Sequence, residues 1–319
     1  MLKVLLIKTS SLGDVVHNLP VASDIRRRFP DARIDWAVEE AYAPLVALHP
    51  SVAGIIPIAI RRWCARPLGS STWSEIGDLR RLFAREQYDA VIDTQGLIKS
   101  ALLARAARGR RHGFDTGSAR EGFAARLYDV RHHVARNLHA VTRNRLLAAS
   151  ALGYRADTPA DYGIRAAAAD TDSGRRGRYA VFLHATSRTD KLWPIDRWIR
   201  LGRVLQRRGM HCVLPWGSDE ERRRSEEIAE ALGTAQVPAL APIAEVAALL
   251  AGAAAVVGVD TGLMHLAAAL GVPVIALFCG SDPDLTGVYG AARARNLGAP
   301  GEIPGPERVL SALDELGAA

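Results

Sequence analysis

The sequence predicts an α/β protein with two domains, each built on a mostly parallel sheet. Along the 319 residues, short apolar runs typical of strands buried on both faces alternate with segments of helical periodicity. That length favours two domains. The hydrophobic content of 49% is ample for two cores and excludes a disordered chain. Polar residues follow many of the apolar runs directly, which is where open parallel sheets bind ligands.

The first half of the chain alternates strands and helices. Strands are expected over residues 3–8, 33–38, 53–60 and 90–94, and helices over residues 15–29, 75–86 and 135–152. From Arg155 to Arg178 the alternation lapses into small and polar residues, which are typical of a linker. We therefore place a first domain at residues 1–165 and a linker at residues 166–178.

The second half repeats the pattern as a domain at residues 179–319. Strands are expected over residues 179–184, 211–215, 255–259 and 274–278, and helices over residues 195–208, 243–251, 263–270 and 307–316. The clearest signal is the stretch 255–278, in which Gly271 and Pro273 end the helix between two strands. The last helix could pack back on the first domain.

The loop after the first strand reads Thr-Ser-Ser-Leu-Gly-Asp at residues 9–14. It contains neither Gly-x-Gly-x-x-Gly nor a P-loop, and this disfavours a nicotinamide oxidoreductase. Asp14 could cap the next helix, or it could act as a general base at the carboxyl end of the strand. After the third strand, Arg61 and Arg62 suit bidentate contact with carboxylate or phosphate, or they form a basic surface loop.

Hydroxyl groups and a lysine follow the first strand of the second domain. Thr186, Ser187 and Lys191 precede a helix that opens with Pro194, and together they would make a phosphate cradle. The ammonium of Lys191 could offset charge on a departing phosphate. After the next strand, Glu221 could accept a ribose hydroxyl, or it could complement the helix dipole.

Asp260, Thr261 and Gly262 end the strand of the clearest stretch and begin its helix. These residues could bind an anion at the helix N-terminus, or Asp260 and Thr261 could simply cap the helix. His265 lies about one turn into the same helix. Its presence there favours a functional interpretation.

The net charge of +7 is uneven, because residues 1–165 hold 25 Lys and Arg against 16 Asp and Glu. The first domain should thus attract a nucleic acid, a phosphorylated small molecule or an anionic membrane, unless its cations merely face solvent. The aromatic residues are too scattered for base stacking, which disfavours nucleic acid. Cys64, Cys212 and Cys279 show no metal-ligand spacing, and no apolar run reaches the length of a membrane span. A cytoplasmic protein without disulfides or metal is expected.

Six short motifs are spread along nearly the whole chain. They are Lys-Thr-Ser-Ser-Leu-Gly-Asp at 8–14, Ile-Arg-Arg-Trp at 60–63, the segment 88–100 around Asp-Thr-Gln-Gly, the segment 183–194 around Thr-Ser-Arg-Thr-Asp-Lys, Leu-Pro-Trp-Gly at 214–217 and Val-Asp-Thr-Gly-Leu-Met-His at 259–265. Jointly they resemble the lipopolysaccharide heptosyltransferases of glycosyltransferase family 9. The first two motifs favour the branch that adds the first heptose of the inner core over the branch that adds the second.

This resemblance implies a GT-B fold, in which two Rossmann-like domains face a central cleft. It implies inverting transfer of heptose from ADP-L-glycero-D-manno-heptose to Kdo-lipid A, without a cofactor or metal. The basic first domain further predicts reversible docking on the anionic cytoplasmic face of the inner membrane. We expect a monomer that binds no nucleic acid.

The resemblance also implies roles for individual residues. Asp14 would be the general base, and Lys191 would assist catalysis from the donor side. The residues expected around the donor are Thr186, Ser187, Lys191, Glu221, Asp260, Thr261, Gly262 and His265. The residues expected around the acceptor are Ser10, Gly13, Arg61, Arg62 and Arg120. Cys64 and Ala65 stand where the family often has further basic residues.

Overall fold

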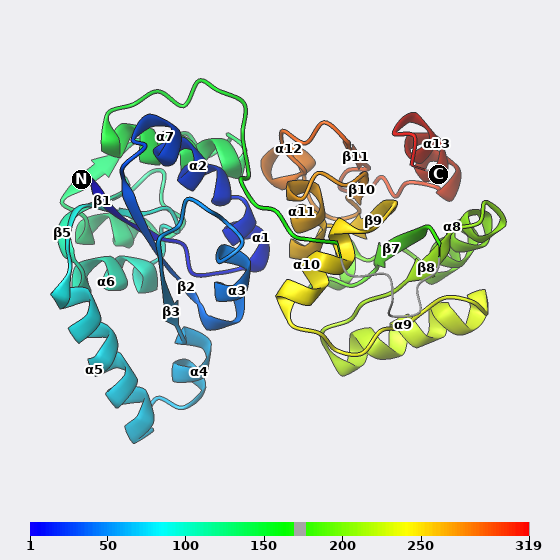
Figure 1. Ribbon diagram of the computed structural model, residues 1–319, viewed down its shortest axis with the longest axis horizontal. Coiled ribbons are helices and arrows are strands. Elements are labelled where there is room, and N and C mark those ends of the chain that lie inside the picture. Colours follow the sequence, from blue (N-terminus) through cyan, green and yellow to red (C-terminus); the bar gives the residue numbers. More distant parts are fainter. Residues whose placement is uncertain (169–176, 319) are drawn as a thin grey trace. The chain divides into compact units, whose positions relative to one another are not determined.

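The computed structural model describes residues 1–168 and 177–318. The chain forms two compact units, Met1–Gly163 and Ile164–Ala319. The division lies just before the expected linker at 166–178, of which residues 169–176 fall outside the described residues. Each unit is a parallel sheet with helices packed against it (Figure 1).

The sheet of the first unit has six parallel strands in the order β3-β2-β1-β4-β5-β6. These strands are β1 (Lys3–Ile7), β2 (Arg33–Glu39), β3 (Gly54–Ile58), β4 (Gln87–Asp93), β5 (Arg108–Phe114) and β6 (Val130–His132). This is the strand order of the Rossmann fold. All strands are parallel, and the order in which they are added reverses between β1 and β4. The loops after β1 and β4 therefore lie side by side at the point where such sheets bind ligands.

Helices cover both faces of this sheet. They are α1 (Leu12–Val16), α2 (Leu19–Arg28), η1 (Glu40–Tyr42), α3 (Ala43–Val46), α4 (Ile60–Ala65), α5 (Ser70–Arg85), α6 (Ile98–Ala106), η2 (Gly122–Leu127) and α7 (Ala140–Leu152). Leu5 and Ile7 of the central strand pack in one core with Phe83 of α5 and Ala101 of α6. Strands buried in this way account for the continuous apolar runs in the sequence.

Two local predictions for the first unit are wrong, and one strand was not predicted. The helix expected at 15–29 is two helices, because Pro20 lies in the first turn of α2, where its missing N–H costs no hydrogen bond. Residues 60–65 form α4, and not a loop. The strand that was not predicted is β5, whose Arg108 and Arg110 are exposed.

The second unit has five parallel strands in the order β11-β10-β9-β7-β8. The strands are β7 (Tyr179–Leu183), β8 (His211–Val213), β9 (Ala255–Val259), β10 (Val274–Leu277) and β11 (Ala294–Leu297). This is a doubly wound order that reverses between β7 and β9. A single parallel bridge from Val213 to Gln236, beyond β8, stands where the Rossmann order has one more strand.

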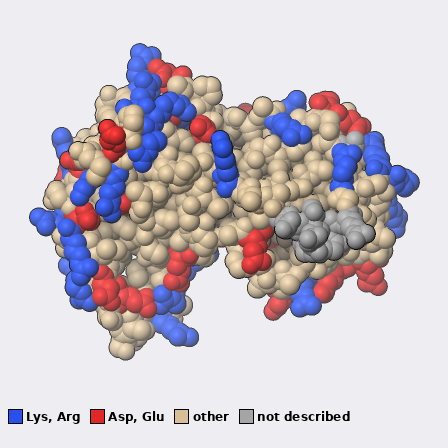
Figure 2. Space-filling view, viewed as in Figure 1, with Lys and Arg blue, Asp and Glu red and all other residues tan. Residues whose placement is uncertain are grey.

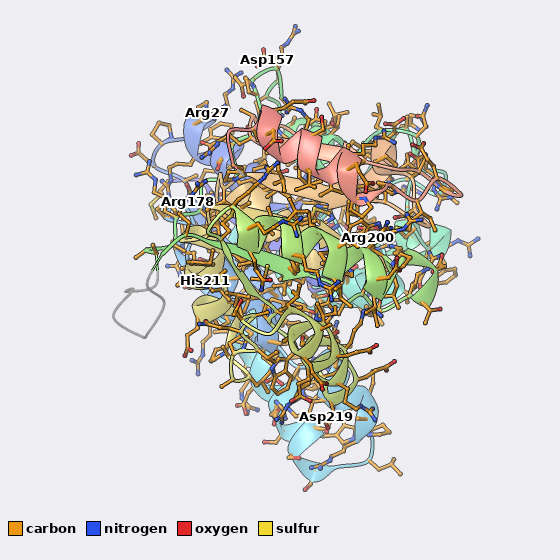
Figure 3. The ribbon with its side chains drawn as sticks, turned by 90° about the vertical axis from the view of Figure 1, so that its right-hand side faces the viewer. Arg27, Asp157, Arg178, Arg200, His211 and Asp219 are labelled. Atoms are coloured by element: carbon orange, nitrogen blue, oxygen red, sulfur yellow. The ribbon has the colours of Figure 1, made fainter. Side chains whose placement is uncertain are left out.

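The helices of the second unit close its core. They are η3 (Thr189–Lys191), α8 (Ile195–Arg207), α9 (Asp219–Leu232), α10 (Ile243–Ala251), α11 (Gly262–Ala269), α12 (Pro283–Thr286) and α13 (Pro306–Glu315). Trp193 and Trp198 are fully buried and pack edge to face, with ring centroids 4.9 Å apart. Figure 3 shows α13 beside α8, on which Arg200 lies, and α9 starting at Asp219. The buried side chains Val309 and Leu313 of α13 belong to the core of the second unit.

Candidate active site

Each unit carries a polar cluster at the reversal point of its own sheet. In the first unit, the cluster is formed by the loops after β1 and β4. In the second unit, the cluster is formed by the loops after β7 and β9. These are the positions at which doubly wound sheets bind ligands.

Asp14 is the centre of the first cluster. Its Oδ2 accepts a hydrogen bond from the backbone N–H of Ser11 at 3.0 Å, so the carboxylate does cap α1. The same oxygen lies 3.2 Å from Nη1 of Arg120, and Oδ1 lies 4.0 Å from Nζ of Lys8. Asp14 can therefore cap α1 and also act as a base, because the capping contact holds its carboxylate in place.

The charges around Asp14 decide its protonation state. Burial alone would raise the pKa of Asp14, but Lys8, Arg120 and the Ser11 N–H together bring that pKa below its ordinary value. Burial lowers the pKa of Lys8, while the nearby Asp14 raises it and the net direction is downward. Asp14 is thus ionised at neutral pH and able to accept a proton.

Two residues that hold this loop were not predicted to have a role. Lys8 is 4% exposed and donates to the Thr94 carbonyl at 2.9 Å. Gln95 accepts from the Thr9 N–H at 3.1 Å and donates to the Ser10 carbonyl at 2.6 Å. These bonds tie the loop after β1 to the loop after β4. A lysine directly after a buried apolar run could have indicated this role from the sequence, because lysine is rarely buried without a partner.

Two further arginines extend the positive charge beside Arg120. Arg136 donates to the Arg120 carbonyl at 3.5 Å. The Arg143 guanidinium lies 4.9 Å from the Phe114 ring centroid, and burial, with Arg136 and Arg120, lowers its pKa. Lys8, Arg120, Arg136 and Arg143 thus form a cationic cluster, in which Lys8 and Arg120 lie next to Asp14. Such a cluster suits a ligand that carries several negative charges.

Arg61 and Arg62 follow a different strand at the same carboxyl end of the sheet. They lie in the first turn of α4, after β3, and β3 is two strand positions from β1, a spacing of about 10 Å between the strands. Arg62 forms ion pairs with Glu40 at 3.1 Å and Glu75 at 2.7 Å, beside a cavity of about 380 Å³. Arg61 donates to the Tyr42 hydroxyl at 2.9 Å. The structure therefore joins Arg120 to Asp14, on the loop that also carries Ser10 and Gly13, but shows no direct contact of Arg61 or Arg62 with that pair.

Replacing Arg120 with leucine is expected to raise the pKa of Asp14. The cation stabilises the ionised carboxylate, so its loss shifts the equilibrium toward the protonated form at any acidic pH. A ¹³C NMR titration of the Asp14 carboxyl measures this directly. Arg131→Leu, at an exposed position of β6, should leave the titration unchanged. An Asp14 titration that is the same in both variants would show that Arg120 does not hold the carboxylate.

Asp260 is the centre of the second cluster. Its side chain is 8% exposed at the end of β9. Oδ2 lies 2.6 Å from Nζ of Lys191 and accepts from the Ser281 hydroxyl at 2.6 Å, and Oδ1 lies 3.6 Å from Nε2 of His265. Burial would raise the pKa of Asp260, but these three neighbours hold it far below the ordinary range. Ser281 was not predicted, because the turn that carries it is distant in sequence.

The other predicted donor residues surround this group to different extents. The Thr186 hydroxyl donates to the Asp260 carbonyl at 3.1 Å, and Thr261 is the N-cap of α11, whose first residue is Gly262. Ser187 is exposed on the same loop. Glu221 lies in the first turn of α9, where its carboxylate accepts from the Gly217 N–H at 2.7 Å. That contact matches the helix-terminus interpretation, and it leaves the second carboxylate oxygen for a ligand.

Two kinds of feature are absent from the described residues. Residues 1–168 and 177–318 contain no group of three or more His, Cys, Asp and Glu side chains placed to hold a metal ion. Within these same ranges, no helix is both long enough and apolar enough to span a bilayer.

The chain is similar to known glycosyltransferases along most of its length. Lipopolysaccharide heptosyltransferase 1 of Salmonella typhimurium is 44% identical over 291 residues, which are 91% of this chain and 92% of the relative. The Pseudomonas aeruginosa protein of the same name is 45% identical over 300 residues, which are 92% of this chain and 82% of the relative. Lipopolysaccharide heptosyltransferase 2 of Escherichia coli is 28% identical over 319 aligned positions, covering 89% of this chain and 85% of that relative.

A solved structure shares the fold closely. The E. coli heptosyltransferase WaaC with ADP is 40% identical, covers 99% of this chain and 100% of its own, and superposes with a TM-score of 0.90. This match and the two parallel sheets confirm the expected α/β architecture of GT-B type. The model of glycosyltransferase family 9 (heptosyltransferase) matches residues 76–310. From this match and from the identity spread over both units, the chain belongs to glycosyltransferase family 9.

Proposed function

We propose that the protein transfers L-glycero-D-manno-heptose from ADP-heptose to the Kdo of Kdo-lipid A, and so adds the first heptose of the lipopolysaccharide inner core. The observation that supports this best is the ionised Asp14 beside the cations of Lys8 and Arg120, in a chain of this family. Relatives named heptosyltransferase 1 from Salmonella, E. coli and Pseudomonas are 43–45% identical, against 27–28% for those named heptosyltransferase 2.

Asp14 is the general base of the proposed reaction. Its carboxylate takes the proton of the acceptor hydroxyl while that oxygen bonds to the anomeric carbon of heptose. The bond from that carbon to the diphosphate breaks, and ADP leaves with the electron pair. One carboxylate without a covalent intermediate gives inversion at the anomeric centre.

The cationic cluster is the proposed grip on the acceptor. Kdo-lipid A is anionic, and the guanidiniums of Arg120, Arg136 and Arg143 would pair with its acidic groups. Arg61 and Arg62 would contact the acceptor farther out, along the edge after β3. Arg62 would then share its charge with Glu40 and Glu75, so its contribution should be smaller than that of Arg120.

The Asp260 cluster is the proposed donor site. Lys191, Thr186 and Ser187 would bind the diphosphate, with the N-terminus of α11 facing it from Thr261 and Gly262. Asp260 and His265 would hydrogen-bond the heptose hydroxyls, and the free oxygen of Glu221 would accept from the ribose. Lys191 offsets the charge that develops on the leaving group, so we propose that the enzyme works without a metal or other cofactor.

The same proposal extends to where the enzyme works. We place it as a monomer on the cytoplasmic face of the inner membrane, held reversibly by its basic first unit and without any role for nucleic acid. Such binding should weaken with salt, because exposed charges are screened.

The direct test offers two acceptors to the purified protein with ADP-heptose. One is deacylated Kdo-lipid A, and the other is the same molecule with one heptose already attached. We expect transfer to the first alone. Transfer only to the second would assign the protein to the step that adds the second heptose, and bound ADP with no transfer to either would reject both substrates.

A further inference from the structure

The face formed by α6 and η2 exposes large apolar side chains. Ile98 and Leu102, one turn apart on α6, are 38% and 54% exposed, and Phe123 on η2 is 55% exposed. The two elements pack against each other. The opposite sides of both are held by the core, in which Ala101, Ala104 and Ala124 are buried.

Cations stand among these apolar side chains. Lys99 and Arg105 on α6 and Arg126 on η2 are exposed. The Arg126 guanidinium lies 5.0 Å from the centroid of the Phe123 ring. Residues 98–106 and 122–127 contain no Asp or Glu. Figure 2 shows basic side chains along the left-hand edge of the first unit, the side on which Figure 1 draws α5, α6 and β5.

This face borders the Asp14 cluster. Glu121, next to Arg120, accepts from the Ile98 N–H at 2.7 Å, and its own N–H donates to the Gly96 carbonyl at 3.0 Å. Gly96 follows Gln95, which holds the Ser10 backbone. A surface in contact with α6 and η2 would therefore lie beside the entrance to the acceptor site.

We propose that the α6–η2 face, made of Ile98, Lys99, Leu102, Arg105, Phe123 and Arg126, docks the protein on an anionic phospholipid bilayer. The proposal rests on the membrane step of the proposed function and names the surface that performs it. Apolar side chains among cations are the composition of segments that lie in a membrane interface. The adjacent carboxylate of Glu121 is engaged by the Ile98 N–H. The cations complement the negative surface potential of an anionic leaflet. With three apolar side chains, the binding is weak enough to be reversed.

The test is sedimentation of the full-length protein with phospholipid vesicles. Wild-type protein should bind vesicles of phosphatidylcholine with phosphatidylglycerol, and it should bind pure phosphatidylcholine far less. Leu102→Ser with Phe123→Ser, and separately Lys99→Glu with Arg126→Glu, should each lower the partition coefficient more than about tenfold. Arg80→Glu with Arg131→Glu, a control with the same change in charge at exposed sites outside this face, should lower it much less.

A second readout separates this proposal from the proposed function. All three double variants should transfer heptose to the water-soluble deacylated acceptor at a rate within about twofold of wild type, because none alters a substrate contact. Absence of transfer in the wild type would reject the function and leave the vesicle result standing. The docking proposal is overturned if the face variants bind vesicles like wild type, or if the control loses as much binding as they do. It is equally overturned if the wild type ignores vesicles and instead forms dimers that Leu102→Ser with Phe123→Ser dissociates.

Discussion

The Asp14→Asn variant is expected to lose turnover by about 10²–10⁴-fold, the usual contribution of a general base. The asparagine oxygen can still accept the Ser11 N–H, so the start of α1 keeps its cap. The amide cannot take a proton from the acceptor hydroxyl, and it leaves Lys8 and Arg120 without their counterion. Steady-state kinetics with ADP-heptose and deacylated Kdo-lipid A measures the loss.

Two controls make this result specific. Asp31→Asn removes an exposed carboxylate of the same unit and should leave turnover unchanged. ADP binding to Asp14→Asn, measured by calorimetry, should stay within about twofold of wild type, because the proposed donor residues belong to the other unit. Turnover of Asp14→Asn that is nearly normal would remove Asp14 from the role of base.

Lys191→Met is expected to reduce turnover by about 10²–10³-fold, the scale seen when one group that stabilises a developing negative charge is lost. Methionine fills much the same space as the lysine stem but has no ammonium to place beside the diphosphate. The variant also breaks the 2.6 Å contact with Asp260, which keeps Ser281 and His265 as neighbours. Kinetics should show a lower kcat together with weaker binding of ADP-heptose.

The matched control for Lys191 lies on the same loop. The guanidinium of Arg188 is exposed and pairs with Asp190, so Arg188→Met should change kcat by less than about threefold. Thermal melts of both variants exclude unfolding at the assay temperature. Equal losses in the two variants would mean that the loop as a whole, and not the Lys191 ammonium, is needed.

The fold could be predicted from the sequence wherever apolar runs are bounded by clear stop signals. The segment 255–278 shows this, because β9 matches the expected strand and α11 lies within one residue of the expected helix. β5 was missed because its exposed half is rich in arginine and carries no apolar alternation. The break between α1 and α2 was missed because the amphipathic pattern of residues 15–29 continues through Pro20, which in the structure lies in the first turn of α2.

The candidate site could be predicted only as separate loops. Asp14, Lys191 and Asp260 were found because each follows a strand. That Lys191 contacts Asp260 depends on β7 lying next to β9, and that Arg120 contacts Asp14 depends on the fold of a loop 106 residues away. Local patterns carry no such pairing. Composition likewise could not show that Arg62 forms ion pairs with Glu40 and Glu75.

The short contact between Lys191 and Asp260 bears on how quickly the enzyme releases its product. If Lys191 holds the diphosphate as proposed, the incoming ligand must share an ammonium that already has a carboxylate partner 2.6 Å away. A tethered competitor of this kind is always present at high effective concentration. It would weaken the hold of Lys191 on the diphosphate. ADP lacks the heptose that Asp260 is proposed to bind, so Asp260 would speed the release of ADP and limit inhibition by accumulated ADP.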